Sequence, residues 1–216
     1  MTSILGLHIE RLAHDGFKIS DGYTIVYVDP FQISEQQEKA DILLVTHEHY
    51  DHCSIEDIQK VIKHDTVIVT IPGCASKLNR LPIKSIKMMT PNQGIDVAGM
   101  HIETIPAYNI NKFRAPGVPF HPKEDGRVGF VFILNGKRIF HAGDTDFTPE
   151  MAALKDINIA LVPVSGTYVM TAEEAAKAVN TFKPEIAIPM HYGVIVGSVA
   201  DAEKFKQLAK VEVLIL

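Results

Sequence analysis

A histidine-rich loop lies between a predicted strand and a predicted helix. The apolar residues 42–45 are typical of a buried strand. Ser54, with Asp57 three residues on, predicts the start of a helix with a capping box. Between them stands the segment Thr46-His47-Glu48-His49-Tyr50-Asp51-His52. Uncompensated burial of such groups is costly. Neutral histidine nitrogens and carboxylate oxygens are ligands of first-row metals, so coordination would satisfy them together.

The spacing within this loop predicts two pairs of ligands. His47 and His49 are two residues apart, so an extended backbone places both imidazoles on the same side. Asp51 and His52 come after the chain has begun to turn, and they face a second point nearby. The zincin helix motif is excluded, because it requires a second histidine where Asp51 stands. The alternative is an incidental cluster of surface histidines, but the strand before the loop and the helix after it favour two neighbouring ions.

The rest of the chain alternates between apolar strands and amphipathic helices. Helices are predicted from Ser54 to residue 63, from Thr171 to Phe182 with Glu174 completing a capping box, and over residues 201–210. Strands are predicted at residues 4–11, 17–19, 23–28, 42–45, 66–71, 85–89, 94–98, 101–105, 127–134, 137–140, 157–162, 186–189 and 211–216.

This order of elements predicts an α/β fold. Two mixed sheets would pack face to face with helices outside, as a four-layer αββα sandwich, in a single domain over residues 1–216. Asn135-Gly136 between two apolar runs predicts a hairpin. Residues 107–126 have little periodicity and predict a long loop, which in a compact domain is usually functional or disordered.

Composition argues against several classes of protein. A net charge of −5 disfavours a nonspecific nucleic-acid binder. No run of 18 apolar residues and no signal-peptide pattern is present, so we expect a cytoplasmic protein without a membrane partner. We expect a small-molecule substrate, and a homo-oligomer is left open. Cys53 and Cys74 make no disulfide framework; Cys53 is either a soft metal ligand or, as we prefer, a small buried residue.

Two later strand ends repeat the chemistry of the histidine loop. Residues 140–146, Phe-His-Ala-Gly-Asp-Thr-Asp, follow the hairpin, and residues 188–193, Ile-Pro-Met-His-Tyr-Gly, follow another apolar strand. Asp144 is a candidate to bridge two cations, and His191 a candidate to complete one of the two sites. Asp29, at the end of an earlier strand, is either part of a turn or a residue that orients a ligand.

These motifs together resemble the metallo-β-lactamase superfamily. The resemblance rests on His47-x-His49-x-Asp51-His52, on Gly143-Asp144 after a hairpin, on His191 after a strand, and on Asp29 as the first motif. Within the superfamily, three segments resemble the small metal-dependent hydrolases related to ascorbate-6-phosphate lactonase: Leu12-Ala13-His14-x-x-Phe17, His141-Ala142-Gly143-Asp144-Thr145 and Pro189-Met190-His191. The substrate is left undefined, because the superfamily includes lactonases, thioesterases, phosphodiesterases, nucleases and sulfur dioxygenases.

The resemblance implies two divalent ions. It assigns His47 and His49 to the first, Asp51, His52 and His191 to the second, and Asp144 to both. We expect zinc, with manganese, iron or nickel as alternatives, because mixed nitrogen and oxygen ligands accept several metals.

The chain departs from this family pattern at one position. Asn109 stands where the relatives usually place a third-motif histidine, and its amide oxygen is a poorer zinc ligand than an imidazole. The first site is therefore weak, empty, or completed by His121 from the following loop, which we favour over Asn109.

The implied reaction is hydrolysis by a metal-activated water, with Asp51 or Asp144 taking and returning the proton. Candidate substrate-binding residues are His14, Asn109, Lys123 and His141, although packing or support of the ligands would equally explain the two histidines. The cations Lys112, Arg114, Lys123 and Arg127 form either an anion-binding rim or a solvated loop face, and their loop is a candidate lid. Besides a small-molecule hydrolase, two readings stay open: a ribonuclease of the same fold, and a non-catalytic metal-binding or sensing protein.

Overall fold

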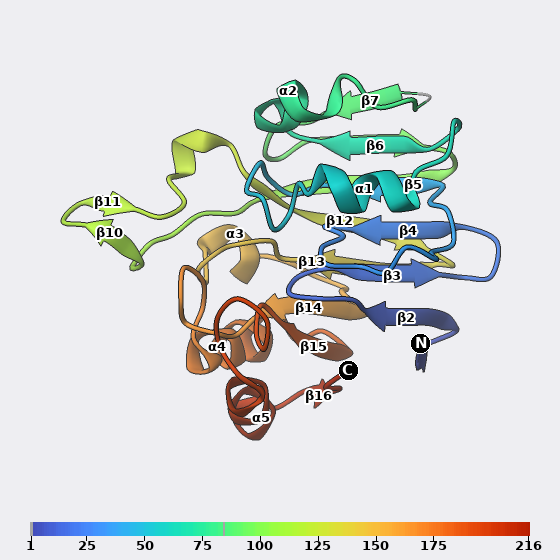
Figure 1. Ribbon diagram of the computed structural model, residues 1–216. Coiled ribbons are helices and arrows are strands. Elements are labelled where there is room, and N and C mark those ends of the chain that lie inside the picture. Colours follow the sequence, from blue (N-terminus) through green and yellow to red (C-terminus); the bar gives the residue numbers. More distant parts are fainter. Residues whose placement is uncertain (1, 84) are drawn as a thin grey trace.

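Two seven-stranded mixed sheets form the body of the protein in a computed structural model that describes residues 2–83 and 85–216 (Figure 1). Strands β1 to β4 of the first sheet pair antiparallel, and β4 to β7 pair parallel. Their order in space follows the chain: β1 (Thr2–Ile4), β2 (Leu7–Arg11), β3 (Phe17–Ser20), β4 (Ile25–Val28), β5 (Ile42–Leu44), β6 (Val67–Thr70) and β7 (Ser85–Met88).

The second sheet combines an antiparallel half with a parallel half. Strands β8, β9, β12 and β13 pair antiparallel, and β13 to β16 pair parallel. Asn135 and Gly136 connect β12 to β13 with positive φ angles of 49° and 68°, so the predicted hairpin is confirmed. The order in space is β16 (Glu212–Val213), β15 (Ile186–Met190), β14 (Ile159–Pro163), β13 (Lys137–His141), β12 (Val128–Leu134), β9 (Met100–Pro106) and β8 (Gly94–Val97).

Helices cover the outer faces, and one hydrophobic core contains residues from both sheets. Helix α4 packs against β14 and α5, and α5 packs against β15 (Figure 1). The predicted four-layer sandwich is therefore confirmed. No described helix is long and apolar enough to span a bilayer. The helices are α1 (Ile55–Val61), α2 (Ala75–Leu78), α3 (Pro149–Ala152), α4 (Ala172–Phe182) and α5 (Val199–Leu208), with single 3₁₀ turns at Pro72–Cys74 and Lys123–Asp125.

The two predicted capping boxes have different outcomes. The Thr171 side chain accepts from the Glu174 amide and the Glu174 side chain accepts from the Thr171 amide, so this box is confirmed. Ser54 caps α1 by accepting from the Asp57 amide, but the Asp57 carboxylate accepts instead from the amides of Gln32 and Ile33. The reciprocal half of that box is therefore absent, because a neighbouring loop takes the carboxylate.

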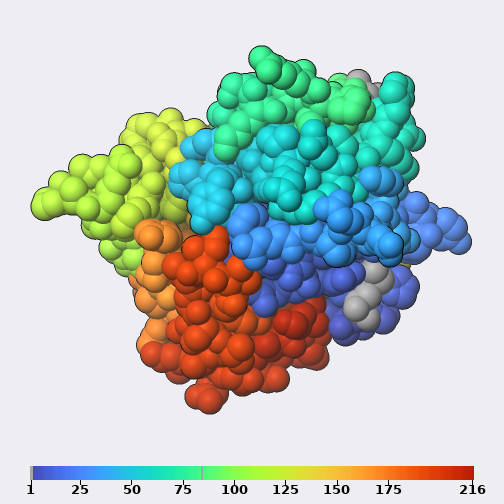
Figure 2. All heavy atoms as spheres, viewed as in Figure 1, coloured from blue at the N-terminus to red at the C-terminus, as the bar shows by residue number. Residues whose placement is uncertain are grey.

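Several predicted segments differ from the structure. A turn at Leu5 and Gly6, both with positive φ, divides the predicted strand 4–11 into β1 and β2. The predicted strand 211–216 shortens to β16, and the short helix α3 was not predicted. The predicted loop 107–126 contains a small antiparallel ribbon of β10 (Phe113–Ala115) and β11 (Val118–Pro119), which projects from the body (Figures 1 and 2). These strands are too short to show a periodicity in the sequence.

Candidate metal centre

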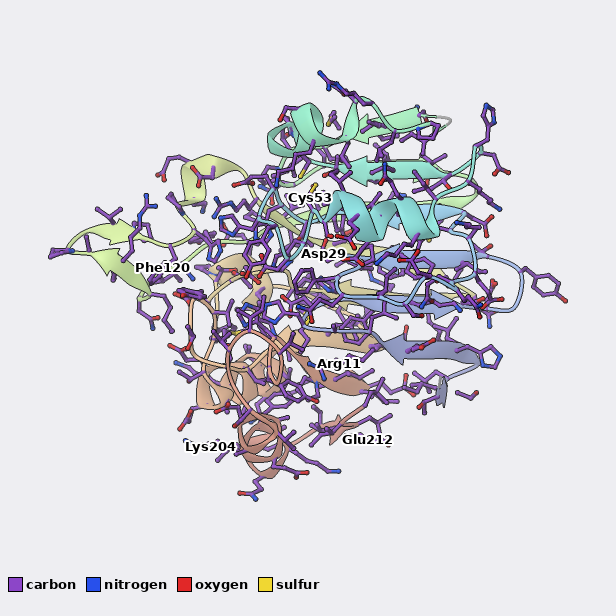
Figure 3. All side chains as sticks on the ribbon, in the orientation of Figure 1. Arg11, Asp29, Cys53, Phe120, Lys204 and Glu212 are labelled. Carbon is purple, nitrogen blue, oxygen red and sulfur yellow. The ribbon has the colours of Figure 1, made fainter. Side chains whose placement is uncertain are left out.

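The ends of five strands bring the predicted ligands to one edge of the sandwich. Asp29 follows β4, the histidine loop follows β5, and Asn109 follows β9, while Asp144 and His191 follow β13 and β15. Ligand sites in open α/β sheets form at such carboxyl ends. Figure 3 shows Asp29 inside the body and Phe120 at the base of the projecting ribbon.

Four side chains make a first cluster of ligand atoms: His47, His49, His121 and Asp144. One atom from each lies within 4.8 Å of the others. The Nε2 atom of His47 is 3.1 Å from Nδ1 of His49, and Nε2 of His121 is 3.4 Å from Oδ2 of Asp144. Bonds of about 2.0–2.1 Å to a tetrahedral ion place ligand atoms about 3.4 Å apart. The cluster therefore fits one ion.

Thr46 and Asp29 fix the ring of His47. The Thr46 hydroxyl donates to Oδ2 of Asp29 at 2.5 Å, so its oxygen is left to accept from Nδ1 of His47 at 3.0 Å. This hydrogen-bond pattern assigns the proton to Nδ1 and leaves the Nε2 lone pair directed at the cluster.

Asn109 orients His121. Its Oδ1 atom accepts from the His121 backbone amide and from the His121 Nδ1, both at 2.9 Å. Its Nδ2 atom donates to Oδ1 of Asp146 and to the carbonyl oxygen of Tyr168. Because both ends of the amide are engaged, the imidazole of His121, and not Asn109, presents a free nitrogen to the first cluster.

A second cluster consists of His14, Asp15, His52 and His191, whose ligand atoms also lie within 4.8 Å of one another. The Nε2 atom of His52 is 3.8 Å from an oxygen of Asp15 and 3.8 Å from an oxygen of Asp51. Asp51 lies beside this cluster, with its Oδ2 atom 3.3 Å from Nε2 of His14.

Two of the three histidines in the second cluster, His52 and His191, have a partner for the other ring nitrogen. Asp29 Oδ2 contacts Nδ1 of His52 at 2.8 Å, and the Ser165 hydroxyl contacts Nδ1 of His191 at 2.8 Å. Such partners fix the orientation of metal-binding imidazoles. Of the two roles predicted for Asp29, the structure therefore favours the orienting one. Asp29, His191 and His14 all have left-handed backbones, with φ of 43°, 61° and 54°, and such strain concentrates at functional sites.

Asp144 lies between the two clusters. Its Oδ1 atom is 3.3 Å from Nε2 of His52 and 3.5 Å from Nε2 of His191, whereas Oδ2 faces His121. Gly143 makes this position accessible, because it has a φ of 63° and a Cβ there would lie 2.9 Å from the carbonyl oxygen of Val128. One carboxylate thus offers an oxygen to each cluster.

Unpaired polar atoms indicate that the clusters suit cations. Within the described residues, buried atoms without a hydrogen-bond partner include both nitrogens of His14, both oxygens of Asp15, Nε2 of His52 and Oδ1 of Asp144. Leaving a buried polar atom unsatisfied costs about 1–3 kcal/mol, and more for a charged group. A divalent ion would satisfy all of these residues at once, so the residues present fit the metal that the fold implies.

The histidines of the first cluster can bind a metal ion without first losing a proton. Burial, followed by the neighbouring charge of His52, lowers the pKa of His47 well below its usual range. Burial and then Arg127 lower the pKa of His49. Burial lowers the pKa of His121 to about 4, with Arg127 adding to the effect and Asp144 opposing it. All three imidazoles are therefore neutral at pH 7.

The second cluster has the opposite electrostatics. Burial lowers the pKa of His52, but Asp144 and Asp29 outweigh it and hold the pKa well above its usual range. Burial also lowers the pKa of His191, but Asp144 and Asp15 outweigh it and raise the pKa to about 8. Binding of a cation here therefore displaces protons.

A cavity of about 450 Å³ opens onto both clusters. Six of its lining residues are potential ligands or lie beside them: His14, His49, Asp51, His121, Asp144 and His191. The opposite wall is mostly apolar and aromatic, with a single cation: Tyr50, Arg114, Phe120, Tyr168, Ile195 and Val196. The cavity therefore combines a polar floor with an apolar wall, as is usual for small-molecule sites.

Three of the four loop cations are engaged elsewhere. Lys112 pairs with Glu174 and Asp146, and Lys123 pairs with Glu150 and lies over the Tyr108 ring. Neither lines the cavity described above.

Arg127 pairs with Glu48 and Asp125. Of these four loop cations, Arg114, on β10, is the one that lines the cavity.

His141 lies beside the centre, whereas the two cysteines lie outside it. His141 is buried; its Nδ1 accepts from the Gly143 amide and its Nε2 contacts the Asp15 carbonyl oxygen at 2.9 Å. It therefore holds the Asp15 loop. Cys53 and Cys74 are both buried and free, outside the two clusters.

Sequence reasoning missed Asp15 and Ser165. Asp15 directly follows the predicted His14, in a turn after β2, and that adjacency was the available signal. Ser165 gave no signal, because its role depends on two parallel strands lying side by side.

Two adjoining ligand clusters at one edge of an αββα sandwich define a metal centre of the metallo-β-lactamase type. The family model described as "Beta-lactamase superfamily domain" matches residues 8–191. A UPF0173 metal-dependent hydrolase from Thermococcus onnurineus is 32% identical, over 96% of this chain and 95% of the relative. One from Thermoplasma acidophilum is 34% identical, over 85% of this chain and 83% of the relative. The chain belongs to this family of metal-dependent hydrolases within the beta-lactamase superfamily.

Solved structures agree with this assignment. A crystal structure from Parabacteroides distasonis, of a protein assigned as a metal-dependent hydrolase, is 34% identical with a TM-score of 0.82, covering 97% of this chain and 92% of that one. Igni18, a metallo hydrolase from Ignicoccus hospitalis, has a TM-score of 0.74 at 22% identity, over 96% of this chain and 94% of its own, which supports the fold. The predicted superfamily and the predicted enzyme class are confirmed.

Proposed function

We propose that this chain hydrolyses a small anionic ester, lactone or phosphodiester with a metal-activated water. One observation carries the proposal: two clusters of ligand atoms adjoin through Asp144 at the floor of a cavity of about 450 Å³. A cavity of this size suits a small molecule.

Two ions would be held by different side chains. His47, His49 and His121 would hold the first ion, which we propose to be zinc, and His52 and His191 the second, with Asp144 shared between them. When bound, the ions supply positive charge that lowers the pKa of water and stabilises negative charge on a substrate oxygen.

Asp51 is suited to accept and return the proton. It lines the cavity and its side chain is 13% exposed. Burial raises its pKa, but His14 and His52 outweigh this effect and lower the pKa below its usual value. The carboxylate is therefore ionised at neutral pH and able to take up a proton.

Arg114 and the apolar wall would select the substrate. Arg114 is the one arginine or lysine among the described residues that line the cavity, so its guanidinium is the natural partner of a phosphate or carboxylate on the substrate. Tyr50, Phe120 and Tyr168 would pack against an apolar part of the substrate and exclude water from it.

The test is elemental analysis of the purified protein, followed by turnover assays on lactones, phosphodiesters and thioesters. We expect two ions per chain and turnover of an anionic member of one class. Two ions without turnover of any of these would support a metal-binding or sensing protein instead.

A further inference from the structure

The segment between β2 and β3 places two additional donors at the second cluster. His14 and Asp15 are both fully buried. Within the described part of the chain, neither oxygen of Asp15 and neither nitrogen of His14 has a hydrogen-bond partner. Protonation of Asp15 would not resolve this, because the new O–H group would still need an acceptor.

Contacts on several sides hold this segment against the loop of His191. The His191 amide donates to the His14 carbonyl oxygen at 3.2 Å. Arg11, labelled in Figure 3, donates to the carbonyl oxygens of Tyr192 at 2.6 Å and His14 at 3.4 Å. His141 holds the Asp15 carbonyl oxygen. Asp15, whose carboxylate has no hydrogen-bond partner among the described residues, and His14, whose Nε2 atom contacts Asp51, are therefore built into the centre.

The distances around the cluster match ligands arranged about one ion. The donor atoms of His14 and Asp51 are 3.3 Å apart, and those of His52 and Asp144 are also 3.3 Å apart. The contact between His52 and Asp15 is 3.8 Å. In an octahedron with bonds of about 2.1–2.3 Å, adjacent ligands lie about 3.0–3.3 Å apart and opposite ligands about 4.2–4.6 Å apart. Two of these three separations have the length expected for adjacent ligands, and the 3.8 Å contact lies between the two ranges.

We propose that His14 and Asp15 are ligands of the second ion, which gives that ion six protein donors and favours a six-coordinate cation such as Mn²⁺ or Fe²⁺ over Zn²⁺. The donors are His14, Asp15, Asp51, His52, Asp144 and His191. The first cluster, with three imidazoles and one carboxylate, matches a four-coordinate ion. The two halves of the centre therefore differ in coordination chemistry. The inference rests on the proposed function only in requiring that two ions bind.

Metal binding by Asp15→Ala and Asp15→Asn tests this assignment without an activity assay. In competition with a chelator, both variants should keep the first ion and bind Mn²⁺ at the second site at least about 100-fold more weakly than the wild type. Replacing a residue that only supports a metal ligand already lowers metal affinity by about 10–100-fold. Asp15→Asn preserves the shape of the side chain if the alanine variant does not fold. Unchanged Mn²⁺ affinity in the folded asparagine variant would overturn the assignment.

Asp57→Asn is the matched control. Asp57 is also a buried carboxylate, but its oxygens are paired with Lys60 and with the amides of Gln32 and Ile33. This variant should retain the wild-type rise in Tm on addition of Mn²⁺, whereas Asp15→Asn should lose part of that rise. An equal loss in both variants would contradict a ligand role for Asp15.

Cobalt substitution tests the coordination number. Four-coordinate Co²⁺ absorbs visible light strongly and six-coordinate Co²⁺ absorbs weakly. Titration of the metal-free wild type should therefore show one strongly absorbing and one weakly absorbing ion. Two strongly absorbing ions would overturn the six-donor site. Failure to hydrolyse any ester with both spectra as expected would count against the proposed function alone.

Discussion

Single side chains determine whether the first metal site is complete. Asn109 stands where the family pattern predicts a histidine, and its amide oxygen accepts from the backbone amide and from Nδ1 of His121, which we propose as the ligand in its place. This orienting role of Asn109 is visible only in three dimensions, because His121 lies twelve positions further along the chain. We therefore propose that His121, from the same loop, compensates for this departure from the family pattern.

Replacing Asn109 with alanine should weaken zinc binding at the first site by about 10–100-fold, because His121 loses the partner of its Nδ1 atom. The measurement is a zinc titration against a chelator. Asn111→Ala is the control, since Asn111 contacts the exposed side of Glu174 and lies outside the cluster. Unchanged zinc affinity in Asn109→Ala would contradict the orienting role.

Replacing Arg114 with alanine should raise KM for an anionic ester and leave KM for its neutral analogue unchanged, because the substrate loses a charge-assisted contact worth roughly 1.5–3 kcal/mol. Steady-state kinetics on the matched pair of substrates measures the effect. Lys123→Ala removes an equal charge from the same segment, but this lysine is paired with Glu150 and should leave both KM values unchanged. Equal changes for both substrates in Arg114→Ala would refute the anion-binding role.

Elements that are distant in sequence are joined around the centre by a few ion pairs. Arg127, which is 7% exposed, contacts Glu48 between the two histidines of the first site, and it also donates to the carbonyl oxygen of Phe120 beside His121. It thereby couples the loop after β5 to the segment that precedes β12. Both segments supply ligands to the first cluster, so this pair sets their separation.

Arg127→Gln should lower the free energy of unfolding by about 1–3 kcal/mol, because it leaves the partly buried carboxylate of Glu48 without its partner. Zinc affinity at the first site should fall with it. Urea unfolding and zinc titration measure the two effects. The ion pair of Lys63 with Asp41 has the more exposed cation, with Lys63 36% exposed against 7% for Arg127, so Lys63→Gln serves as a control that should change stability by less than about 1 kcal/mol. Similar losses in both variants would argue against a special role for Arg127.

Local signals explain which elements were predictable from the sequence. Apolar runs gave β5 and β14, the Asn135-Gly136 pair gave the hairpin, and Thr171 with Glu174 gave the start of α4. The ribbon β10–β11 was not predicted, because its strands depend on pairing with each other rather than on burial. The role of Asp15 was missed for a related reason. Its neighbours in the centre follow β5, β13 and β15, and no local sequence pattern indicates that they meet.

At the scale of the whole molecule, the fold concentrates buried charge at one edge. The carboxylates of Asp15, Asp29 and Asp144 surround His52 and His191, and they keep these imidazoles protonated when no cation is bound. The metal-free protein should therefore depend on pH in a way that the metal-loaded protein does not.

Because the pKa of His191 is raised to about 8 in the folded state, its protonation stabilises the metal-free fold. This contribution is fully present below the unfolded pKa of about 6.5 and is lost as the pH rises through about 8; a difference of about 1.5 units corresponds to about 2 kcal/mol. The stability gap between wild type and His191→Gln, measured by urea unfolding in the presence of a chelator, should therefore shrink by about 2 kcal/mol from pH 6 to pH 9. A gap that stays constant or widens would contradict the raised pKa.

An anomalous difference map from a crystal of the metal-loaded protein tests most directly whether two ions share one carboxylate. Two peaks should flank Asp144, one among His47, His49 and His121 and the other beside His52 and His191. A single peak, or peaks that do not contact Asp144, would contradict the account.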